Sequence, residues 1–220
     1  MNLIEKIFRK KTKEIPTIHI KIKKLDEMAV MPFYAHEGDV CMDMTAIGVD
    51  YDEETDTYIY HTGLAFESDY NIGQLMFPRS GNCKKEAYLT NSVGVIDCAI
   101  FRGEVQFRYK NRTSLKTYRE LMGQRVYNST FMNCLQHWNG TPSEWSKIIS
   151  WAYETANEAY QRTVDEINQK AKNLEYAPYK VGDKVGQMVL IEYKNIVLTE
   201  VDELSDSVRG TDGFGSTDIK

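Results

Sequence analysis

One carboxylate in the middle of the sequence is placed where it could do acid–base chemistry. Asp97 follows strand-forming residues at 93–96, and further strand-forming residues at 101–107 come after it. This pattern predicts a β-hairpin over Asn91–Gln106 with Asp97 at its tip. A hairpin tip can hold an acid in a cleft, and its unpaired backbone groups can hydrogen-bond a flat polar ligand. The alternative is an ordinary surface turn, in which Asp is a common residue.

Two further stretches carry groups that suit an anion or a metal ion. Asp43 lies between two methionines in the strand-like stretch Val40–Thr45, and faces either a site or the outer surface of that strand. The turn Pro78–Asn82 offers the guanidinium of Arg79 and the hydroxyl of Ser80, and both can donate hydrogen bonds to a phosphate. Turns with these residues are common, so the second stretch alone decides nothing.

The C-terminal end carries a glycine-rich run around one cation and one aromatic ring. Residues 209–217 combine Arg209 and Phe214 with glycines and hydroxyl residues. A segment so rich in glycine is not expected to be ordered by itself. Closing over a ligand, it would bring a ring, a cation and backbone N–H donors together. The alternative is a plain disordered terminus.

Composition limits the range of functions. The 220-residue chain is 42% hydrophobic with a net charge of −5, which is ordinary for a globular protein and unsuited to general binding of nucleic acid. It has no apolar run that could cross a bilayer and no secretory signal, and we interpret the basic residues 1–16 as a solvated arm. We therefore expect neither a nucleic acid nor a membrane as a partner. Four cysteines without paired spacing argue against a zinc site or disulfides, and for a reducing, cytoplasmic compartment.

Short strands and an inserted pair of helices are predicted to position these residues. Alternating apolar residues predict strands at 17–23, 40–45, 57–60, 64–67, 72–77, 188–193 and 196–199. Residues 113–173 instead show helical spacing, with an apolar stripe from Leu115 to Trp138. A capping box at Thr141–Glu144 then begins a second helix of about thirty residues. The apolar stripe of this second helix needs a partner, which is the first helix, the β body or another subunit.

In this order and at this spacing, the stretches resemble the five motifs of the homotrimeric dUTP diphosphatases (dUTPases). The matching segments are Val40–Met44, Pro78–Gly81, Gly94–Asp97 with Arg102–Gly103, Gly182–Gln187 and Arg209–Thr217. The resemblance covers residues 17–111 and 178–218, and the helical stretch lies outside the family's usual pattern.

The resemblance implies a mainly β fold, a jelly-roll or β-clip body with an inserted helical hairpin. It implies a homotrimer with active sites at subunit interfaces. The chain then divides into a basic arm (1–16), a β domain (17–111 and 178–208), a helical insert (112–177) and a flexible glycine-rich arm (209–220).

The resemblance also implies a reaction, the hydrolysis of dUTP to dUMP and pyrophosphate, which keeps uracil out of DNA and supplies dUMP for dTMP synthesis. Asp97 is expected to be the general base that deprotonates the water attacking the α-phosphorus, and Asp43 to hold Mg²⁺ through a water. The residues expected to contact the phosphate chain are Arg79, Ser80, Gln187, Arg209, Ser216 and Thr217. Those expected around uracil and the sugar are Asn91, Gly94, Val95, Ile96, Phe101 and the stacking ring of Phe214, and Gly81, Gln106 and Gly215 complete the substrate-binding positions.

The chain departs from the family pattern where sugar and base are expected. The family usually has a tyrosine three residues after the general-base Asp, whereas here Phe101 follows Asp97 by four residues and lacks the hydroxyl. The added residue is expected to form a bulge. Cys41 stands where glycine is usual, and Asp218 adds negative charge to the tail.

Other functions stay open at this level. A related deoxynucleotide hydrolase or a dCTP deaminase could use the same fold, although the chain has no deaminase-type Arg-Ser-Ser run. A regulatory protein could bind nucleotide and contact a protein partner through the helical insert, which carries three tryptophans. The insert could instead pack on the trimer and only stabilise it.

Overall fold

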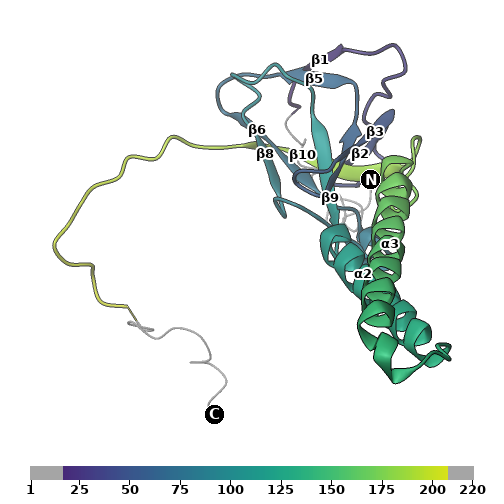
Figure 1. Ribbon diagram of the computed structural model, residues 1–220. Coiled ribbons are helices and arrows are strands. Elements are labelled where there is room, and N and C mark those ends of the chain that lie inside the picture. Colours follow the sequence, from purple (N-terminus) through teal and green to yellow (C-terminus); the bar gives the residue numbers. More distant parts are fainter. Residues whose placement is uncertain (1–16, 208–220) are drawn as a thin grey trace, which may run out of the picture.

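The computed structural model describes residues 17–207, which form a β body from which a helical hairpin projects (Figure 1). Its strands are β1 (Lys21–Lys24), β2 (Met42–Thr45), β3 (Gly48–Asp52), β4 (Thr57–His61), β5 (Leu64–Glu67), β6 (Ile72–Phe77), β7 (Ala87–Leu89), β8 (Gly94–Ile96), β9 (Gln106–Asn111) and β10 (Lys184–Glu192). Its helices are η1 (Ser80–Lys84), α2 (Leu115–Gln136), η2 (Pro142–Glu144) and α3 (Trp145–Lys172). The predicted fold class, mainly β with an inserted helical hairpin, is confirmed.

One sheet of the body carries most of the predicted site residues. Its strand order is β2-β10-β6-β8, with every neighbouring pair antiparallel. The strand β10 brings Gln187 opposite Asp43 on one side and opposite Phe77 on the other. At the edge of the sheet, Gly94 of β8 lies opposite Met76 of β6. This register gathers segments that are far apart in the sequence.

A second sheet, with the order β3-β4-β9-β7, shares its core with the first. Strand side chains alternate between two faces, so each strand sends every other residue inward. Tyr58 and Tyr60 of β4 and Phe107 and Tyr109 of β9 are fully buried there. The first sheet fits closely against them, because a Cβ on Gly186 of β10 would lie 1.9 Å from the Phe107 ring.

The predicted β-hairpin over Asn91–Gln106 is wrong. The strands β8 and β9 are consecutive but lie in different sheets, since β8 pairs with β6 while β9 pairs with β4 and β7. Residues 97–105 therefore cross between the sheets, and Val105 in this crossing donates its N–H to the Leu64 carbonyl at 2.9 Å. An alternating pattern indicates that a segment is a strand, but it does not say which strand is its neighbour.

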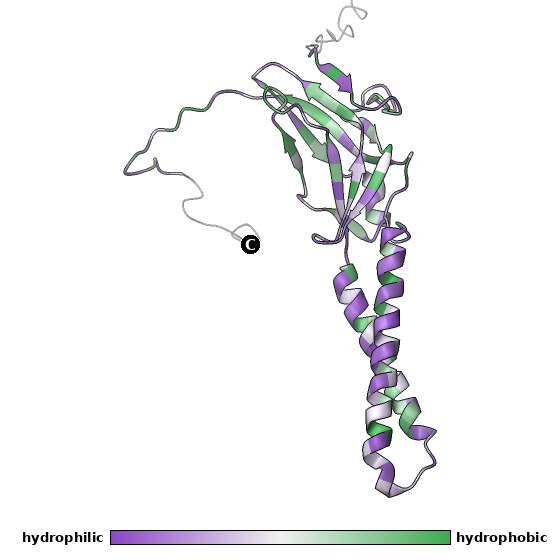
Figure 2. Cartoon of the chain, turned by 45° about the horizontal axis from the view of Figure 1, so that its top comes forward, coloured by the Kyte–Doolittle hydropathy of each residue, from purple (hydrophilic) through white to green (hydrophobic). Residues whose placement is uncertain are grey.

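The predicted helical hairpin is confirmed. The helices α2 and α3 lie side by side and extend away from the β body (Figure 2). The capping box predicted at Thr141 and Glu144 is present, and it precedes α3, which has 28 residues. Among the described residues, no helix has the length and apolar character of a bilayer span.

The contact face of α2 differs from the predicted apolar stripe. Leu121 is 61% exposed, whereas Gly123 is buried and a Cβ there would lie 2.5 Å from the Tyr160 ring of α3. The facing side of α3 includes the fully buried small residues Ala152 and Ala156. Small residues allow the two helices to approach closely, which hydrophobic spacing alone does not reveal.

A buried carboxylate fixes the start of α2 to the body. Asp56, in the turn between β3 and β4, accepts hydrogen bonds from the Ser114 hydroxyl at 2.8 Å and the Leu115 N–H at 2.9 Å. A negative charge at a helix N-terminus is favourable. On the returning segment, the Tyr176 carbonyl accepts from the Asn111 side chain at 3.0 Å. Both ends of the insert are therefore tied to the body.

The strand predicted at Ile196–Thr199 is wrong. The last strand ends at Glu192, and the described chain after it runs away from the body in extended form (Figure 1). Ile196, Val197 and Leu198 are 81, 89 and 89% exposed. Burying such an apolar segment requires a surface that residues 17–207 of one chain do not supply.

Candidate active site

A buried carboxylate holds two cations at one end of the first sheet. Asp43 of β2 accepts from Arg79 Nε at 2.7 Å and from Lys184 Nζ at 2.8 Å. The Asp43 side chain is 8% exposed, and those of Arg79 and Lys184 are 36% exposed. Arg79 follows the end of β6 and Lys184 begins β10, so the strand register brings the three side chains together. Charge-assisted hydrogen bonds of this length hold both cations in place.

The geometry decides between the two orientations considered for Asp43. The residue is buried, so the orientation toward the outer surface of its strand is wrong. Both carboxylate oxygens accept from cations, which does not fit direct ligation of a metal ion. Within residues 17–207, no group of three or more His, Cys, Asp or Glu side chains is arranged to hold a metal ion.

Arg79 lies between two pockets, of which the larger suits an anion. One pocket, of about 300 Å³, is lined by Arg79 with Asp43, Gln187, Cys41, His36 and Asp39 among others. The other, of about 400 Å³, is lined by Arg79 with two more cations and two glycines among others: Lys85, Lys184, Gly81 and Gly182. Ser80 is exposed at the start of η1, beside Arg79. Several cations around one concavity favour a ligand with several negative charges, such as a polyphosphate.

Asp97 lies on a tight turn directly after β8. Its side chain is exposed and has no hydrogen-bond or ion-pair partner among the described residues. Its carbonyl accepts from the N–H groups of Ile100 and Phe101 at 3.0 and 2.8 Å, so the added residue lies in this turn and not in a strand bulge as predicted. The Arg102 guanidinium braces the turn by donating, at 2.9 Å each, to the carbonyls of Cys98, Ala99 and Phe101.

The residues expected around uracil lie along the edge strand β8. Asn91 precedes it, and Gly94, Val95 and Ile96 form it. Since β8 pairs only with β6 among the described strands, its outer edge leaves backbone groups free for a ligand. A Cβ on Gly94 would meet Met76 Cβ at 3.1 Å, which explains a glycine there.

One chain does not bring the two halves of the predicted site together. Gly94 is opposite Met76 on an antiparallel strand. From this pair, Arg79 lies three residues along in one direction and Asp97 three residues along in the other. At about 3.3 Å per residue, the two side chains are separated by about 20 Å along the strands. Consistently, the described pockets that contain Arg79 do not include Asp97.

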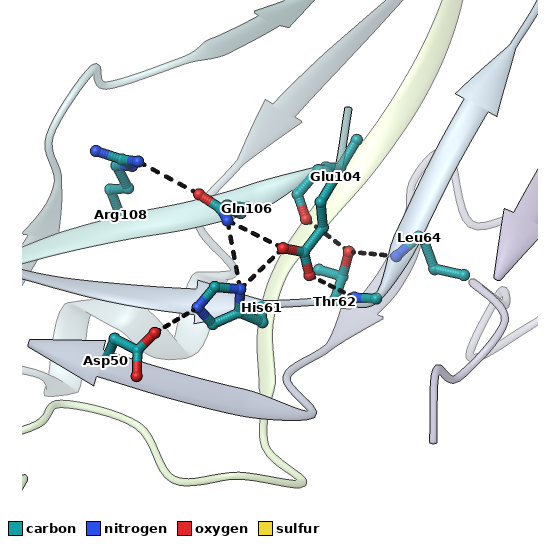
Figure 3. A network of polar contacts seen from close by, with 9 residues as sticks. Asp50, His61, Thr62, Leu64, Glu104, Gln106 and Arg108 are labelled. Atoms are coloured by element: carbon teal, nitrogen blue, oxygen red, sulfur yellow. Dashed lines mark hydrogen bonds and ion pairs between the residues drawn. The ribbon is translucent and has the colours of Figure 1, made fainter. Parts of the chain in front are cut away.

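Gln106 lies apart from the other predicted substrate residues. It belongs to a polar network on the second sheet, shown in Figure 3, where its Nε2 donates to Glu104 Oε2 at 2.9 Å. At the centre of this network, the His61 ring contacts Glu104 at 2.8 Å and Asp50 at 2.9 Å. Burial lowers the pKa of His61, but the hydrogen bonds to the two carboxylates outweigh it and raise that pKa above its ordinary value. Gln106 therefore has a structural role in the β body.

Three cations near the predicted residues were missed by sequence reasoning. Lys184 and Arg102 stood within the quoted motifs, but nothing in their spacing reveals the ion pair to Asp43 or the brace on the Asp97 turn. Lys85 lay outside them. The predicted tail residues Arg209, Phe214, Gly215, Ser216 and Thr217 lie outside the described range.

Comparison with known proteins adds independent evidence. No model of a known protein family matches the chain. A deoxyuridine 5'-triphosphate nucleotidohydrolase of Trichodesmium erythraeum is 38% identical over 87 residues, which span 39% of this chain and 61% of that relative. The enzyme of the same name from Picosynechococcus is 27% identical over 201 residues, covering 91% of this chain and 99% of the relative. The chain is thus similar to dUTPases over most of its length.

Solved structures agree on the fold. A dUTPase of Staphylococcus bacteriophage 80alpha, solved with dUpNHpp, superposes with a TM-score of 0.53 at 18% identity. The match covers 91% of this chain and 98% of the phage chain. The described β body with its inserted helices thus has a dUTPase-like fold.

Proposed function

We propose that the chain hydrolyses dUTP to dUMP and pyrophosphate. The observation that carries this proposal is the cluster of Arg79 and Lys184 around the buried Asp43, which borders a pocket that Lys85 also lines. Its family relatives are named for this activity. A related deoxynucleotide hydrolase or a deaminase would need a different group at the base-binding edge.

In the proposed reaction, Asp97 accepts a proton from a water as that water attacks the α-phosphorus. A bond forms between the water oxygen and the phosphorus, and the bond from the phosphorus to the oxygen bridging to the β-phosphate breaks. Pyrophosphate leaves with the bonding electrons, and its charge is neutralised by Arg79 and Lys184. An exposed carboxylate on a braced turn suits this task, because the remaining work is positioning and charge neutralisation.

The base and sugar are proposed to lie along β8. Backbone groups from Gly94 to Ile96, with the Asn91 side chain, hydrogen-bond uracil in this arrangement. Phe101, which is 42% exposed beside Asp97, offers a ring face to the deoxyribose. A ring packed there leaves no room for a ribose 2′-hydroxyl. The tail residues 209–217 are proposed to close over the ligand, with Phe214 stacked on uracil and the cation and hydroxyls on the phosphates.

The active form is proposed to be a homotrimer whose sites are shared between subunits. The separation of about 20 Å between Arg79 and Asp97 means that a complete site needs each from a different chain. The exposed apolar segment 196–204 after β10 supports the same assembly, since another subunit is the surface that would bury it. That segment also leads directly into the proposed closing tail.

Mg²⁺ is proposed as the cofactor, and when bound it would neutralise charge on the triphosphate. Asp43 does not suit direct ligation of the metal ion, because its carboxylate oxygens already accept hydrogen bonds from Arg79 and Lys184. We assign to Asp43 the positioning of these two cations, in place of the water-mediated metal contact implied by the resemblance.

The helical insert is proposed to offer a surface to a protein partner. Its far end exposes aromatic side chains that a purely structural hairpin would bury, with Trp145 47%, Trp151 50% and Tyr153 49% exposed. Deleting residues 115–172 and joining the ends tests this: turnover of dUTP should survive while partner binding is lost.

The catalytic proposal is tested by measuring pyrophosphate release from dUTP, dCTP, dTTP and UTP. We expect release from dUTP alone, and its loss by at least about a thousandfold in Asp97→Asn. Asp165→Asn is the matched control, because this exposed carboxylate lies on α3, far from β8. Fast release from dCTP or UTP would show that the substrate is not dUTP alone. Full activity of Asp97→Asn would show that Asp97 is not the general base.

A further inference from the structure

A pocket of about 350 Å³ lies where the helical insert joins the β body, and we call it the root pocket. Its walls come from three segments: Lys85 and Glu86 before β7, Asn111 at the end of β9 followed by Leu115 and Tyr118 of α2, and Tyr176 and Pro178 on the return from α3. A pocket of this size can enclose a small molecule. It is separate from Asp97 and β8, and none of the roles proposed above uses it.

The larger part of the lining is apolar or aromatic. Leu115 is 4% exposed, and the Tyr118 and Tyr176 rings meet nearly edge to face, with centroids 6.2 Å apart and planes at 68°. Neither tyrosine hydroxyl has a hydrogen-bond partner among residues 17–207. Burial raises the pKa of Tyr176 above its ordinary value. Such a lining favours a planar ring.

A cation, a carboxylate and two hydrogen-bonding groups complete the lining. The carboxylate, Glu86, is 89% exposed and pairs with Arg112 at 3.9 Å, not with Lys85. The Lys85 ammonium lies 5.0 Å from the centroid of the Tyr179 ring, with no carboxylate in ion-pair distance in the described part of the chain. Asn111 uses its amide nitrogen on the Tyr176 carbonyl, which leaves its side-chain oxygen as an acceptor. Thr113 adds a hydroxyl. An unneutralised cation beside aromatic faces favours a ligand that combines a ring with negative charge.

We propose that the root pocket is a second ligand site, which takes a small aromatic anion of the class of a nucleoside monophosphate. The ring lies against Tyr118 and Tyr176, polar groups of the ring meet Asn111 and Thr113, and the phosphate lies on Lys85. Because the walls belong to both the body and the insert, the bound ligand ties the two together. Lys85 also lines the larger Arg79 pocket, so the two sites share one cation.

The test separates this site from the proposed active site by using the full-length Arg79→Ala chain. Isothermal titration calorimetry with dAMP, whose base is not the uracil proposed to bind along β8, should show saturable binding. Inorganic phosphate, which lacks a ring, should bind far more weakly. Tyr118→Ala and Lys85→Met should each weaken nucleotide binding about tenfold, the usual effect of losing a ring contact. Leu121→Ala, exposed on the same helix outside the pocket, should leave the Kd unchanged.

Two results would overturn the proposal. One is the absence of dAMP binding to a folded Arg79→Ala chain, including the case in which a neighbouring subunit covers the pocket. The other is a Kd that Tyr118→Ala leaves unchanged. Tyr118→Phe keeps the ring and its packing and should bind like the parent, so it distinguishes loss of the site from a failure of the alanine variant to fold.

Discussion

Replacing Asp43 by Asn separates a positioning role from a metal-ligand role. The change keeps the side chain's size but removes the charge that holds Arg79 and Lys184 at 2.7 and 2.8 Å. A hydrogen bond to a charged group contributes about 1.5–3 kcal/mol when it is buried. Because both cations are 36% exposed and regain water, we expect a total loss of about 2 kcal/mol. For a chain of this length, that lowers the Tm by roughly 4–8 °C.

The same substitution should change the kinetics in a defined way. With Arg79 and Lys184 no longer fixed, the KM for dUTP should rise by about tenfold or more, because the phosphate contacts lose their preorganised geometry. The Mg²⁺ concentration at half-maximal rate should stay unchanged. Asp39→Asn is the matched control, since Asp39 lines the same pocket but contacts His36 and neither of the two cations. An unchanged Tm and KM together with a large shift in the Mg²⁺ midpoint would refute the positioning role.

Three further outcomes are expected. Asp56→Ala should remove the anchor of Leu115 at the start of α2, cost about 1–3 kcal/mol in thermal unfolding and speed proteolysis of the insert, and an unchanged cleavage rate would contradict the anchor. The pKa of His61 is raised in the folded state, so its contribution to stability is complete below its ordinary value of 6.5 and is lost as the pH rises through the folded pKa. The fall in Tm over that range should be smaller in His61→Gln, and an identical pH profile would count against the contact to Glu104. Arg102→Ala should loosen the turn after β8 and lower kcat more than it raises KM, and intact kcat would show that the brace is dispensable.

Local signals in the sequence predicted local features of the structure. The capping box at Thr141 and Glu144 and the helical spacing around it predicted α3, because helix caps and periodicity involve residues within a few positions. The strands β4, β5 and β6 were recognised for the same reason. The order and spacing of the short motifs predicted roles in the reaction for Arg79 and Asp97, because this sequence of motifs is specific.

The pairing of strands that are far apart in the sequence could not be predicted in the same way. Nothing near Asp43 indicates that its partners come 36 and 141 positions later, because the β2-β10-β6 register alone brings them together. The false hairpin after β8 has the same origin, since the partner of a short strand depends on the whole sheet. Ile196–Thr199 has the composition of a strand but no sheet edge to join among the described residues. The strand propensity of this segment therefore predicted a strand that a single chain does not form.

Subunit complementation tests the shared active site most directly. Asp97→Asn and Arg79→Ala chains, each carrying a different affinity tag, are purified alone and after co-expression, and pyrophosphate release from dUTP is measured. Each variant alone should be inactive. In mixed trimers, a site that takes Asp97 from one subunit and Arg79 from another is intact in about a quarter of random combinations, so activity should recover to about a quarter of the parent's. Mixed trimers as inactive as either variant would show that one chain supplies both residues and would contradict the account.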